Sequence, residues 1–280
     1  LDMDYLETLL KKHEPAAVII VHVLGVPNNM DSLLDLKKRY DFVLMEDTCA
    51  ATGSRYDGQL VGTLGEVSTF SFYYGHHFST IEGGMVCTND EELHDILLHI
   101  RSHGWAKNLA PDTEQKQARE HGVIEFNRPF TFYHPGFNVR STDLNARIGL
   151  SQISRIDHVV QRRIENHRVY QTRFSDTPGF HCQRNDRAVI CSISFAALAQ
   201  SHEHRERIAT ALSENDIETR PLGGGNMSLQ PFWSDRYGSN VFPVADRIHT
   251  TGFQLPNHPL LSLEDINYIC DTVLSVRSDD

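Results

Sequence analysis

Two adjacent histidines, His76 and His77, lie in a run rich in serine, tyrosine and glycine that extends from residue 68 to residue 84. Imidazole titrates near neutral pH, so a histidine can accept a proton and return it within one reaction. It cannot form the Schiff base through which a lysine holds an aldehyde cofactor. The run therefore predicts proton transfer rather than covalent capture of a carbonyl compound.

Other polar residues follow strand-like segments in the same region. Asp47 ends one apolar segment, Ser71 ends the next, and Gly83 and Gly84 form a turn beyond the histidines. These residues fit a site for a phosphorylated aromatic cofactor, because they combine a carboxylate, a hydroxyl followed by imidazoles, and a Gly-Gly turn. An acid at this position also fits a simple cap of the segment that follows it.

The elements that must position these residues are strands and helices that alternate along the first 100 residues. This alternation is typical of a parallel sheet with helical crossovers. Because ligands collect at the carboxyl ends of parallel strands, Asp47 and His76 are expected at one edge of the sheet. We expect strands at 16–23, 42–45, 67–72 and 85–88, a helix at 30–40, and a second helix capped by Asn89 that ends near 102.

The second half of the chain predicts a smaller α+β unit. Residues 105–135 lose periodicity and contain three prolines, so we expect a long loop layer there. A helical spine at 142–174 should join two domains, at 1–160 and 161–280. Beyond it we expect strands at 189–195 and 217–220, a helix at 203–213, and a last helix that begins after Ser262 with a capping box.

Composition excludes several classes of function. The net charge of -11, without a block of Lys and Arg, argues against nucleic acid as a partner. We expect no membrane span, because no apolar run is long enough to cross a membrane. We expect no secretion signal, because the N-terminus lacks the basic, apolar and small-residue segments of such a signal. The five cysteines show no metal-binding spacing, which predicts neither a metal site nor an iron-sulfur cluster. The expected location is the cytoplasm.

Taken in order, the motifs resemble the DegT/DnrJ/EryC1/StrS family of sugar aminotransferases, which depend on pyridoxal 5'-phosphate. The resemblance implies an α/β, aspartate-aminotransferase-like fold (type I), with a mainly parallel sheet in the large domain and a small α+β C-terminal domain. It covers almost the whole chain. The matching segments are 21–25, Glu46-Asp47 with Gly53, 62–65, Phe70-Ser71-Phe72, 82–84, 136–140 followed by Thr142, and Arg220-Pro221.

The family pattern also implies roles for single residues. Asp47 would face the pyridine nitrogen of the cofactor and Ser71 its phosphate, while Asn138 would reach the phosphate in a neighbouring subunit of a homodimer. Arg140 and Arg220 are candidates for contacts with a nucleotide-sugar substrate, since guanidinium groups suit phosphates. His103 resembles a second catalytic histidine. The residue types also permit structural roles: a turn for Asn138, surface ion pairs for the arginines and a helix cap for His103.

In this family the position five residues after Ser71 normally carries the cofactor lysine, and here it is His76. Histidine at this place resembles the subgroup that dehydrates GDP-4-keto-6-deoxymannose at carbon 3, in dideoxysugar and O-antigen biosynthesis. The resemblance implies a lyase that holds pyridoxal 5'-phosphate or pyridoxamine 5'-phosphate non-covalently, with L-glutamate as amino donor. His77 is expected to be structural, and His22 to line or support the pocket.

Two departures from the family pattern keep other readings open. Position 50 is alanine, and the family's phosphate loop has no counterpart before residue 16, so the large domain is expected to lack its N-terminal part. Whether such a truncated chain binds the cofactor and is active stays open at this point. A nucleotide-sugar aminotransferase that works with non-covalent cofactor, and a non-catalytic relative that serves as a dimer partner, are the alternatives.

Overall fold

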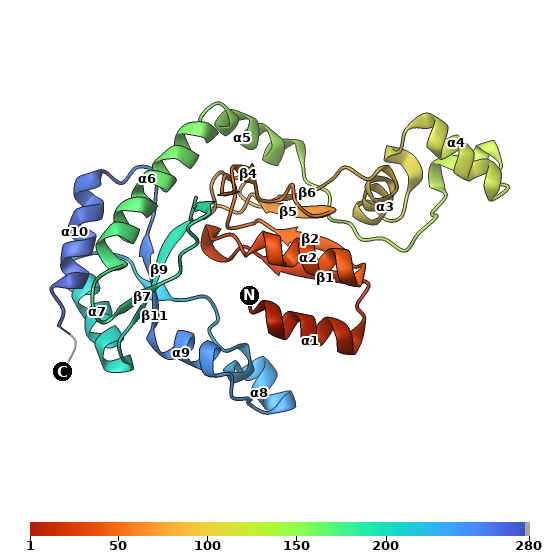
Figure 1. Ribbon diagram of the computed structural model, residues 1–280. Helices are drawn as coiled ribbons and strands as arrows, with labels where there is room; N and C mark the ends of the chain where they lie inside the picture. The colour runs from red at the N-terminus through yellow and green to blue at the C-terminus, as the bar shows by residue number, and fades with distance from the viewer. Residues whose placement is uncertain (278–280) are drawn as a thin grey trace.

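The computed structural model describes residues 1–277 and builds them around two four-stranded sheets (Figure 1). In the first sheet three strands run parallel, and the fourth, β6, is antiparallel to its neighbour β5. The parallel part was predicted; the reversal of β6 was not. The strand order is β1 (Ala17–Val21), β2 (Val43–Asp47), β5 (Val67–Ser71) and β6 (Gly84–Thr88).

Two helices pack together on one face of this sheet, α1 (Met3–His13) and α2 (Met30–Tyr40). The sequence sets the limits of α2, because the Asn29 side chain caps its first turn and Asp41 ends it in the left-handed conformation. The core beneath is apolar, and each fully buried Leu or Met adds about 1.5–3 kcal/mol. Its members include Leu6, Leu10, Ile20, Met30, Leu33, Leu36 and Leu44.

The opposite face of the first sheet is open. Its β1 residues alternate in exposure, and Ile19 is 67% exposed. Val21 and Val43 are exposed on the same face, as is Val86 on β6. Asp47 follows Val43 at a spacing of four residues, so its side chain points to this same open face.

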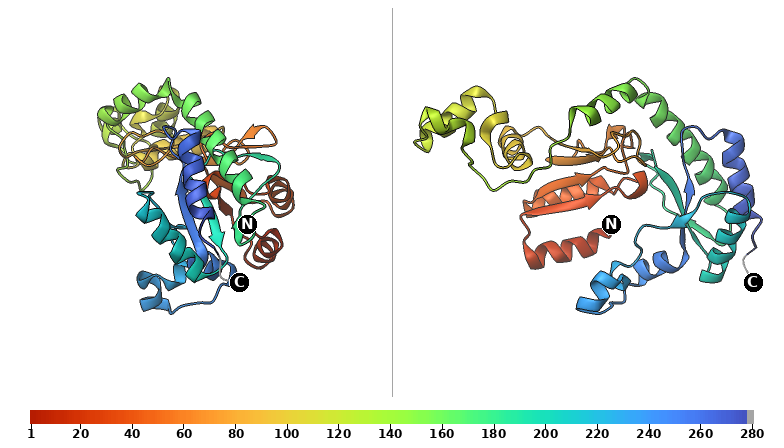
Figure 2. Two further views of the ribbon diagram at one scale, coloured as in Figure 1. Left: turned by 90° about the vertical axis from the view of Figure 1, so that its left-hand side faces the viewer. Right: turned by 180° about the vertical axis from the view of Figure 1, so that it is seen from behind.

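An arm projects from the β6 side of the sheet (Figures 1 and 2). It begins with α3 (Glu91–Arg101), whose N-cap is Asp90 rather than the predicted Asn89. The loop layer predicted at 105–135 is wrong, because this segment contains α4 (Pro111–Glu120) between short 3-10 turns at Ala106–Asn108 and Glu125–Phe130. Only Ala118 of α4 is buried, so the helix left almost no apolar periodicity in the sequence.

The predicted spine consists of two helices, α5 (Asp143–Ile153) and α6 (Ile156–Phe174), with a break at residues 154 and 155. The predicted domain boundary at residue 160 falls inside α6 and stays a prediction. The side chains of α6 that face the second sheet form an aromatic layer with Phe195, where Tyr170 stacks on the Phe195 ring at 4.9 Å.

The second sheet is antiparallel, in the order β10 (Arg220–Pro221), β11 (Gly252–Pro256), β9 (Ser194–Ala199), β7 (Phe180–Cys182). It packs against α6, α7 (His202–Glu214) and α10 (Leu263–Leu274). The capping box predicted at Ser262 is confirmed, with Asp265 as its partner. The strand predicted at 189–195 is wrong, because that segment is divided between β8 (Ala188–Val189) and the start of β9.

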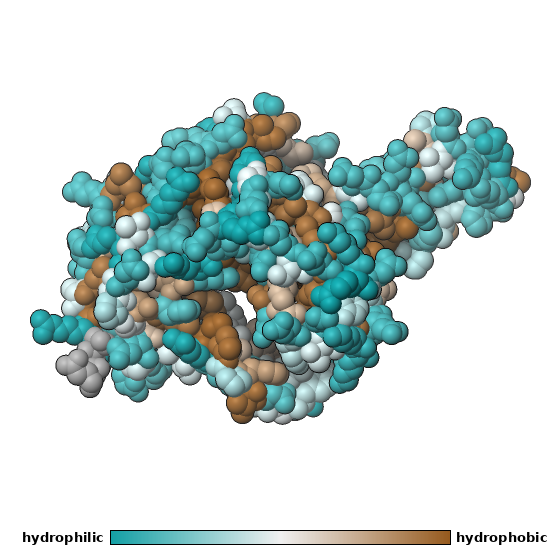
Figure 3. Space-filling model, in the orientation of Figure 1, coloured by the Kyte–Doolittle hydropathy of each residue, from teal (hydrophilic) through white to brown (hydrophobic). Residues whose placement is uncertain are grey.

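The remaining elements connect the two halves. A small three-stranded sheet joins β8 to the hairpin of β3 (Arg55–Tyr56) and β4 (Gln59–Leu60). Short 3-10 turns at Val23–Gly25 and Met227–Leu229 and the helices α8 (Pro231–Tyr237) and α9 (Pro243–Thr251) complete the chain. Apolar residues border the hollow between the halves (Figure 3), where a pocket of about 480 Å³ lies between β9 and α9.

Candidate active site

The sheet brings Asp47 and Ser71 to one face. Asp47 pairs with Thr69 on the neighbouring strand, and Ser71 lies two residues beyond Thr69. Because side chains alternate along a strand, all three point to the open face. Asp47 Oδ1 accepts a hydrogen bond from the Cys49 backbone N–H at 2.9 Å, and the Cys49 thiol also interacts with this carboxylate. A carboxylate and a hydroxyl thus lie on the same face near the ends of neighbouring strands.

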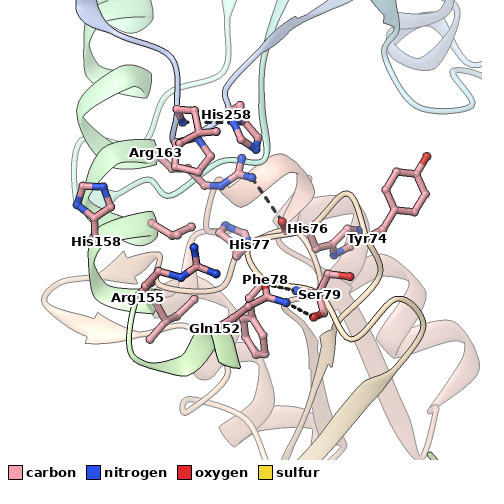
Figure 4. Close-up of a pocket in the computed structure, with 14 residues that line it drawn as sticks. Tyr74, His76, His77, Phe78, Ser79, Gln152, Arg155, His158, Arg163 and His258 are labelled. Carbon is pink, nitrogen blue, oxygen red and sulfur yellow. Dashed lines mark hydrogen bonds between the residues drawn. The ribbon is translucent and has the colours of Figure 1, made fainter. Parts of the chain in front are cut away.

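Residues 72–80, which we call the histidine loop, follow β5 and are fixed from α5. The Ser79 N–H donates to the Gln152 side chain at 3.1 Å, and the Gln152 amide donates back to the Ser79 carbonyl at 2.6 Å. The Asn145 amide donates to the Thr80 carbonyl at 2.7 Å. Figure 4 shows Gln152 reaching Ser79 from the helix. Both ends of the helix α5 therefore help to position the loop.

The two histidines of this loop differ in environment. His77 is 4% exposed, and its Nε2 lies 3.0 Å from the Cys191 carbonyl, to which it can only donate. Burial, with the nearby positive charge of Arg163, lowers the pKa of His77 to about 3, so its ring is neutral. The structure thus gives His77 a fixed place in the interior and no proton to exchange near neutral pH.

His76 is partly exposed, and no hydrogen bond within the described residues fixes its ring as the Cys191 carbonyl fixes that of His77. Its backbone N–H closes a turn on the Tyr73 carbonyl, and its ring meets the Tyr73 ring edge to face at 5.9 Å. Its Nδ1 is buried and has no hydrogen-bond partner among the described residues. An imidazole without a fixed partner, in a loop held at both ends, is suited to move a proton to or from a bound molecule.

Three predicted site residues, His103, Asn138 and Arg140, cluster at the base of the arm. The Arg140 guanidinium donates to Asn138 Oδ1 at 3.1 Å and lies 3.4 Å from His103 Nε2. The His103 backbone N–H donates to the Phe137 carbonyl at 2.7 Å, which ties the two segments together. Among residues 1–277, no hydrogen bond joins this cluster to Asp47, Ser71 or His76. The chain therefore presents its predicted site residues in separate groups.

Arg220 lies beside the histidine loop rather than with Arg140. It stands on β10 and pairs weakly with Glu218 at 3.4 Å. A pocket of about 340 Å³ lies between this strand and the loop, and Tyr74 and Arg163 line it together with Arg220. An exposed guanidinium at the mouth of such a pocket can receive a phosphate or hydroxyl group.

The sequence did not predict the support that Glu46 provides next to Asp47. Glu46 is 1% exposed, and its carboxylate accepts backbone hydrogen bonds from Gly62, Leu64 and Gly65 at 2.6–2.8 Å. His22 adds a fourth bond at 3.1 Å. Because the Asn28 N–H donates to His22 Nδ1, the neutral ring must carry its proton on Nε2. His22 thus supports the strand end through Glu46, and its expected role at a cofactor pocket stays a prediction.

Arg163 is the second residue that was missed. It is 4% exposed, and its guanidinium donates to four backbone carbonyls, one of them that of His76. Burial lowers the pKa of Arg163. A signal existed in the sequence, because Arg163 falls in the buried stripe of α6 with Ile164, His167 and Tyr170. A charged residue in such a stripe indicates buried acceptors.

Comparison with known proteins assigns this arrangement of strands and loops to a family. The model of the DegT/DnrJ/EryC1/StrS aminotransferase family matches residues 1–274. This chain belongs to that family. Among its relatives is a GDP-4-keto-6-deoxy-D-mannose 3-dehydratase of Escherichia coli O55:H7, which is 30% identical over 258 residues, or 90% of this chain and 66% of that protein. A GDP-perosamine synthase of Escherichia coli O157:H7 is 32% identical, and the match covers 94% of this chain and 66% of the length of that protein.

Solved structures of the family confirm the α/β fold. A GDP-4-keto-6-deoxymannose-3-dehydratase with a trapped PLP-glutamate geminal diamine superimposes with a TM-score of 0.83 and 27% identity. The match covers 98% of this chain and 71% of that one. This chain spans 57 to 66% of the length of the curated family members it matches first. Within residues 1–277, no helix has both the length and the apolar character that crossing a membrane requires.

Proposed function

We propose that this family member is a 3-dehydratase of a nucleotide-linked 4-keto-6-deoxy sugar, of the GDP-4-keto-6-deoxymannose type. The observation that carries the proposal is His76, which stands five residues after Ser71, where the family pattern has its cofactor lysine. An imidazole cannot hold the cofactor covalently, but it can take a proton and return it to a departing hydroxyl group. The dehydratase named among the relatives supports this reading.

The open sheet face fits a pyridoxal cofactor. The Asp47 carboxylate at the end of β2 would face the pyridine nitrogen, and the Ser71 hydroxyl would bind the phosphate. When bound, a protonated pyridine ring supplies an electron sink for the reaction. Without a lysine, pyridoxal 5'-phosphate or pyridoxamine 5'-phosphate would be held by such contacts alone. The name of the related solved structure shows that a family member binds PLP together with glutamate.

The chain's own residues would divide the work around the bound sugar. His76 moves the proton, and the hydrogen bond from Arg163 to its carbonyl holds that part of the loop in place. Arg220 would receive the nucleotide-sugar beside the loop, where its guanidinium is exposed. We assign Arg140 to substrate binding and His103 to a second catalytic role, as the family pattern implies; the two side chains lie 3.4 Å apart.

The arm supports a homodimer with a shared active site. It carries exposed aromatic side chains, including Phe126, Phe130 and Phe137, and it projects from the sheet (Figure 1). At its base, Asn138 is exposed and would reach the cofactor phosphate of the neighbouring subunit. L-Glutamate is the proposed amino donor. We further propose a cytoplasmic location and a role in dideoxysugar and O-antigen biosynthesis, in line with a relative named for lipopolysaccharide biosynthesis.

Two alternatives keep specific support. The 32% identity to a GDP-perosamine synthase favours a sugar aminotransferase that works with non-covalent cofactor. Ala50, where the family pattern usually has Gln, His or an acid, favours a non-catalytic family member that acts as a dimer partner. The second alternative requires that the purified protein neither binds PLP nor turns over a 4-keto sugar nucleotide.

A His76→Asn variant tests the proposal. General acid-base catalysis contributes about 10²–10⁴-fold, so dehydration of GDP-4-keto-6-deoxymannose should fall by about that factor while PLP binding, followed by absorbance, persists. His94→Asn, an exposed histidine on α3, is the matched control and should retain full activity. Unchanged dehydration by His76→Asn would remove His76 from the mechanism.

A further inference from the structure

A separate pocket of about 270 Å³ lies between the histidine loop, the start of α6 and residues 258–260 (Figure 4). Asp47, Ser71 and Arg220 do not line it, but His76 and Tyr74 do, so the pocket adjoins the proposed active site at the histidine loop. A water molecule takes about 30 Å³ of liquid volume, so the pocket has room for a phosphate-sized ion and several waters. None of its lining residues is Asp or Glu.

Positive charge and free N–H groups converge on this pocket from α6. Arg155 is the N-cap residue of this 19-residue helix, and its side chain makes no capping bond. The first N–H groups of a helix have no intrahelical acceptor, and they favour an anion. The Arg155 guanidinium has no hydrogen-bond partner within residues 1–277, and Figure 4 shows it reaching from α6 toward His77.

His77 adds a hydrogen-bond acceptor. Its Nε2 donates to the Cys191 carbonyl, so Nδ1 of the neutral ring carries a lone pair. This Nδ1 is buried and has no partner among the described residues. A buried polar atom without a partner is unusual in a folded protein. Nδ1 of His76, which also lines the pocket, is likewise buried and without a partner among the described residues. The pocket therefore combines donors for an anionic oxygen with ring nitrogens that a ligand can satisfy with a proton of its own.

Two further side chains strengthen the donor side. Arg163 is nine-tenths buried, its hydrogen bonds go to carbonyls rather than carboxylates, and its Nε is unpartnered. Its charge is thus not neutralised locally. The Leu260 N–H donates to Nδ1 of His258, so the neutral His258 ring has its proton on Nε2 and can donate it.

We propose that this pocket binds inorganic phosphate as a hydrogen phosphate ion. Its charged oxygens lie against Arg155 and the first N–H groups of α6, and its hydroxyl donates to Nδ1 of His77. Such an ion links α6 to the loop that carries His76 and so restrains that loop. Sulfate has the same shape and charge but no proton near neutral pH, so it leaves His77 unsatisfied. The proposal does not depend on the dehydratase reaction.

Calorimetric titration of the purified protein with phosphate and with sulfate, at equal ionic strength and pH 7.5, tests it. We expect one phosphate per chain, bound about three- to tenfold more tightly than sulfate, as one hydrogen bond implies. Arg155→Gln should weaken phosphate at least about tenfold, since it removes a charge-assisted contact. Arg168→Gln, an exposed arginine on the same helix, should change nothing.

Ser71→Ala separates this pocket from the proposed cofactor phosphate site. Phosphate binding that survives in Ser71→Ala and is lost in Arg155→Gln supports the proposal. It is overturned if phosphate does not bind, if binding is lost in Ser71→Ala but kept in Arg155→Gln, or if sulfate binds as tightly as phosphate. Because no sugar substrate is used, a failed dehydratase assay leaves this result unaffected.

Discussion

Replacing Glu46 by alanine should lower the free energy of unfolding by about 3–5 kcal/mol. The carboxylate accepts four hydrogen bonds, from the N–H groups of Gly62, Leu64 and Gly65 and from His22 Nε2. A hydrogen bond to a charged group contributes about 1.5–3 kcal/mol. The four do not add in full because the turn at 62–65 can relax. Even so, the loss is a large share of the roughly 5–15 kcal/mol that stabilises a domain.

Glutamine at position 46 should have a smaller but clear effect. Oε1 accepts two bonds and Oε2 accepts two, so either orientation of the amide turns its NH2 group toward two donors. We expect a loss of about 2–4 kcal/mol. Glu165→Gln is the control, because Glu165 is partly exposed on α6 and its pairing with Arg162 contributes at most about 1 kcal/mol.

The dependence of stability on pH tests the role of Glu46 independently. Burial acts to raise the pKa of Glu46, but the bonds from His22 and the turn outweigh it and hold the pKa below its usual value. A lowered folded-state pKa gives stability that is present above the unfolded pKa and lost as the pH falls through the folded one. Urea denaturation followed by circular dichroism at pH 7 and below pH 4 should show a larger loss in the native protein than in Glu46→Gln, where only the other carboxylates with lowered pKa values, such as Glu66 and Glu114, still contribute. Equal stability of the Glu46→Ala and Glu165→Gln variants would refute the reasoning.

Three further predictions concern single residues. Arg163→Leu should lose about 3–5 kcal/mol in urea denaturation, because four carbonyls lose their donor; a loss under 1 kcal/mol would contradict this. Ser262→Ala removes a capping box and should cost about 0.5–2 kcal/mol, measured in the same way. His76→Lys should make PLP covalently trappable by borohydride, detected as added mass on that residue. Trapping in the control His103→Lys instead would place the cofactor elsewhere.

The regular elements near the site could be predicted because their boundaries rest on local chemistry. Helix α2 begins and ends where the sequence analysis expected it, since the Asn29 cap and the change from apolar spacing at Asp41 are both visible in the sequence. The segment at 111–120 was predicted as loop because Pro111 resembles a breaker, although proline is well suited to the first position of a helix. Because only Ala118 of this helix is buried, the sequence also shows no apolar periodicity that would predict it.

The site could be predicted only in part, because sequence order does not give contacts between distant segments. Asp47 and Ser71 follow neighbouring strands, so their common face could be expected from strand order. The four hydrogen bonds to Glu46 and the four from Arg163 join segments that lie 16 to 94 residues apart, so no local sequence pattern predicts them. The cluster of His103 with Arg140 likewise depends on the fold of the arm.

The fate of the amino nitrogen tests the central proposal most directly. The purified protein would be incubated with PLP, GDP-4-keto-6-deoxymannose and ¹⁵N-labelled L-glutamate, and both ammonia and the sugar nucleotide would be analysed by mass spectrometry. The dehydratase role of His76 predicts ¹⁵N in ammonia and a 3-deoxy sugar free of label. A stable amino sugar that retains ¹⁵N would contradict it and favour the aminotransferase reading.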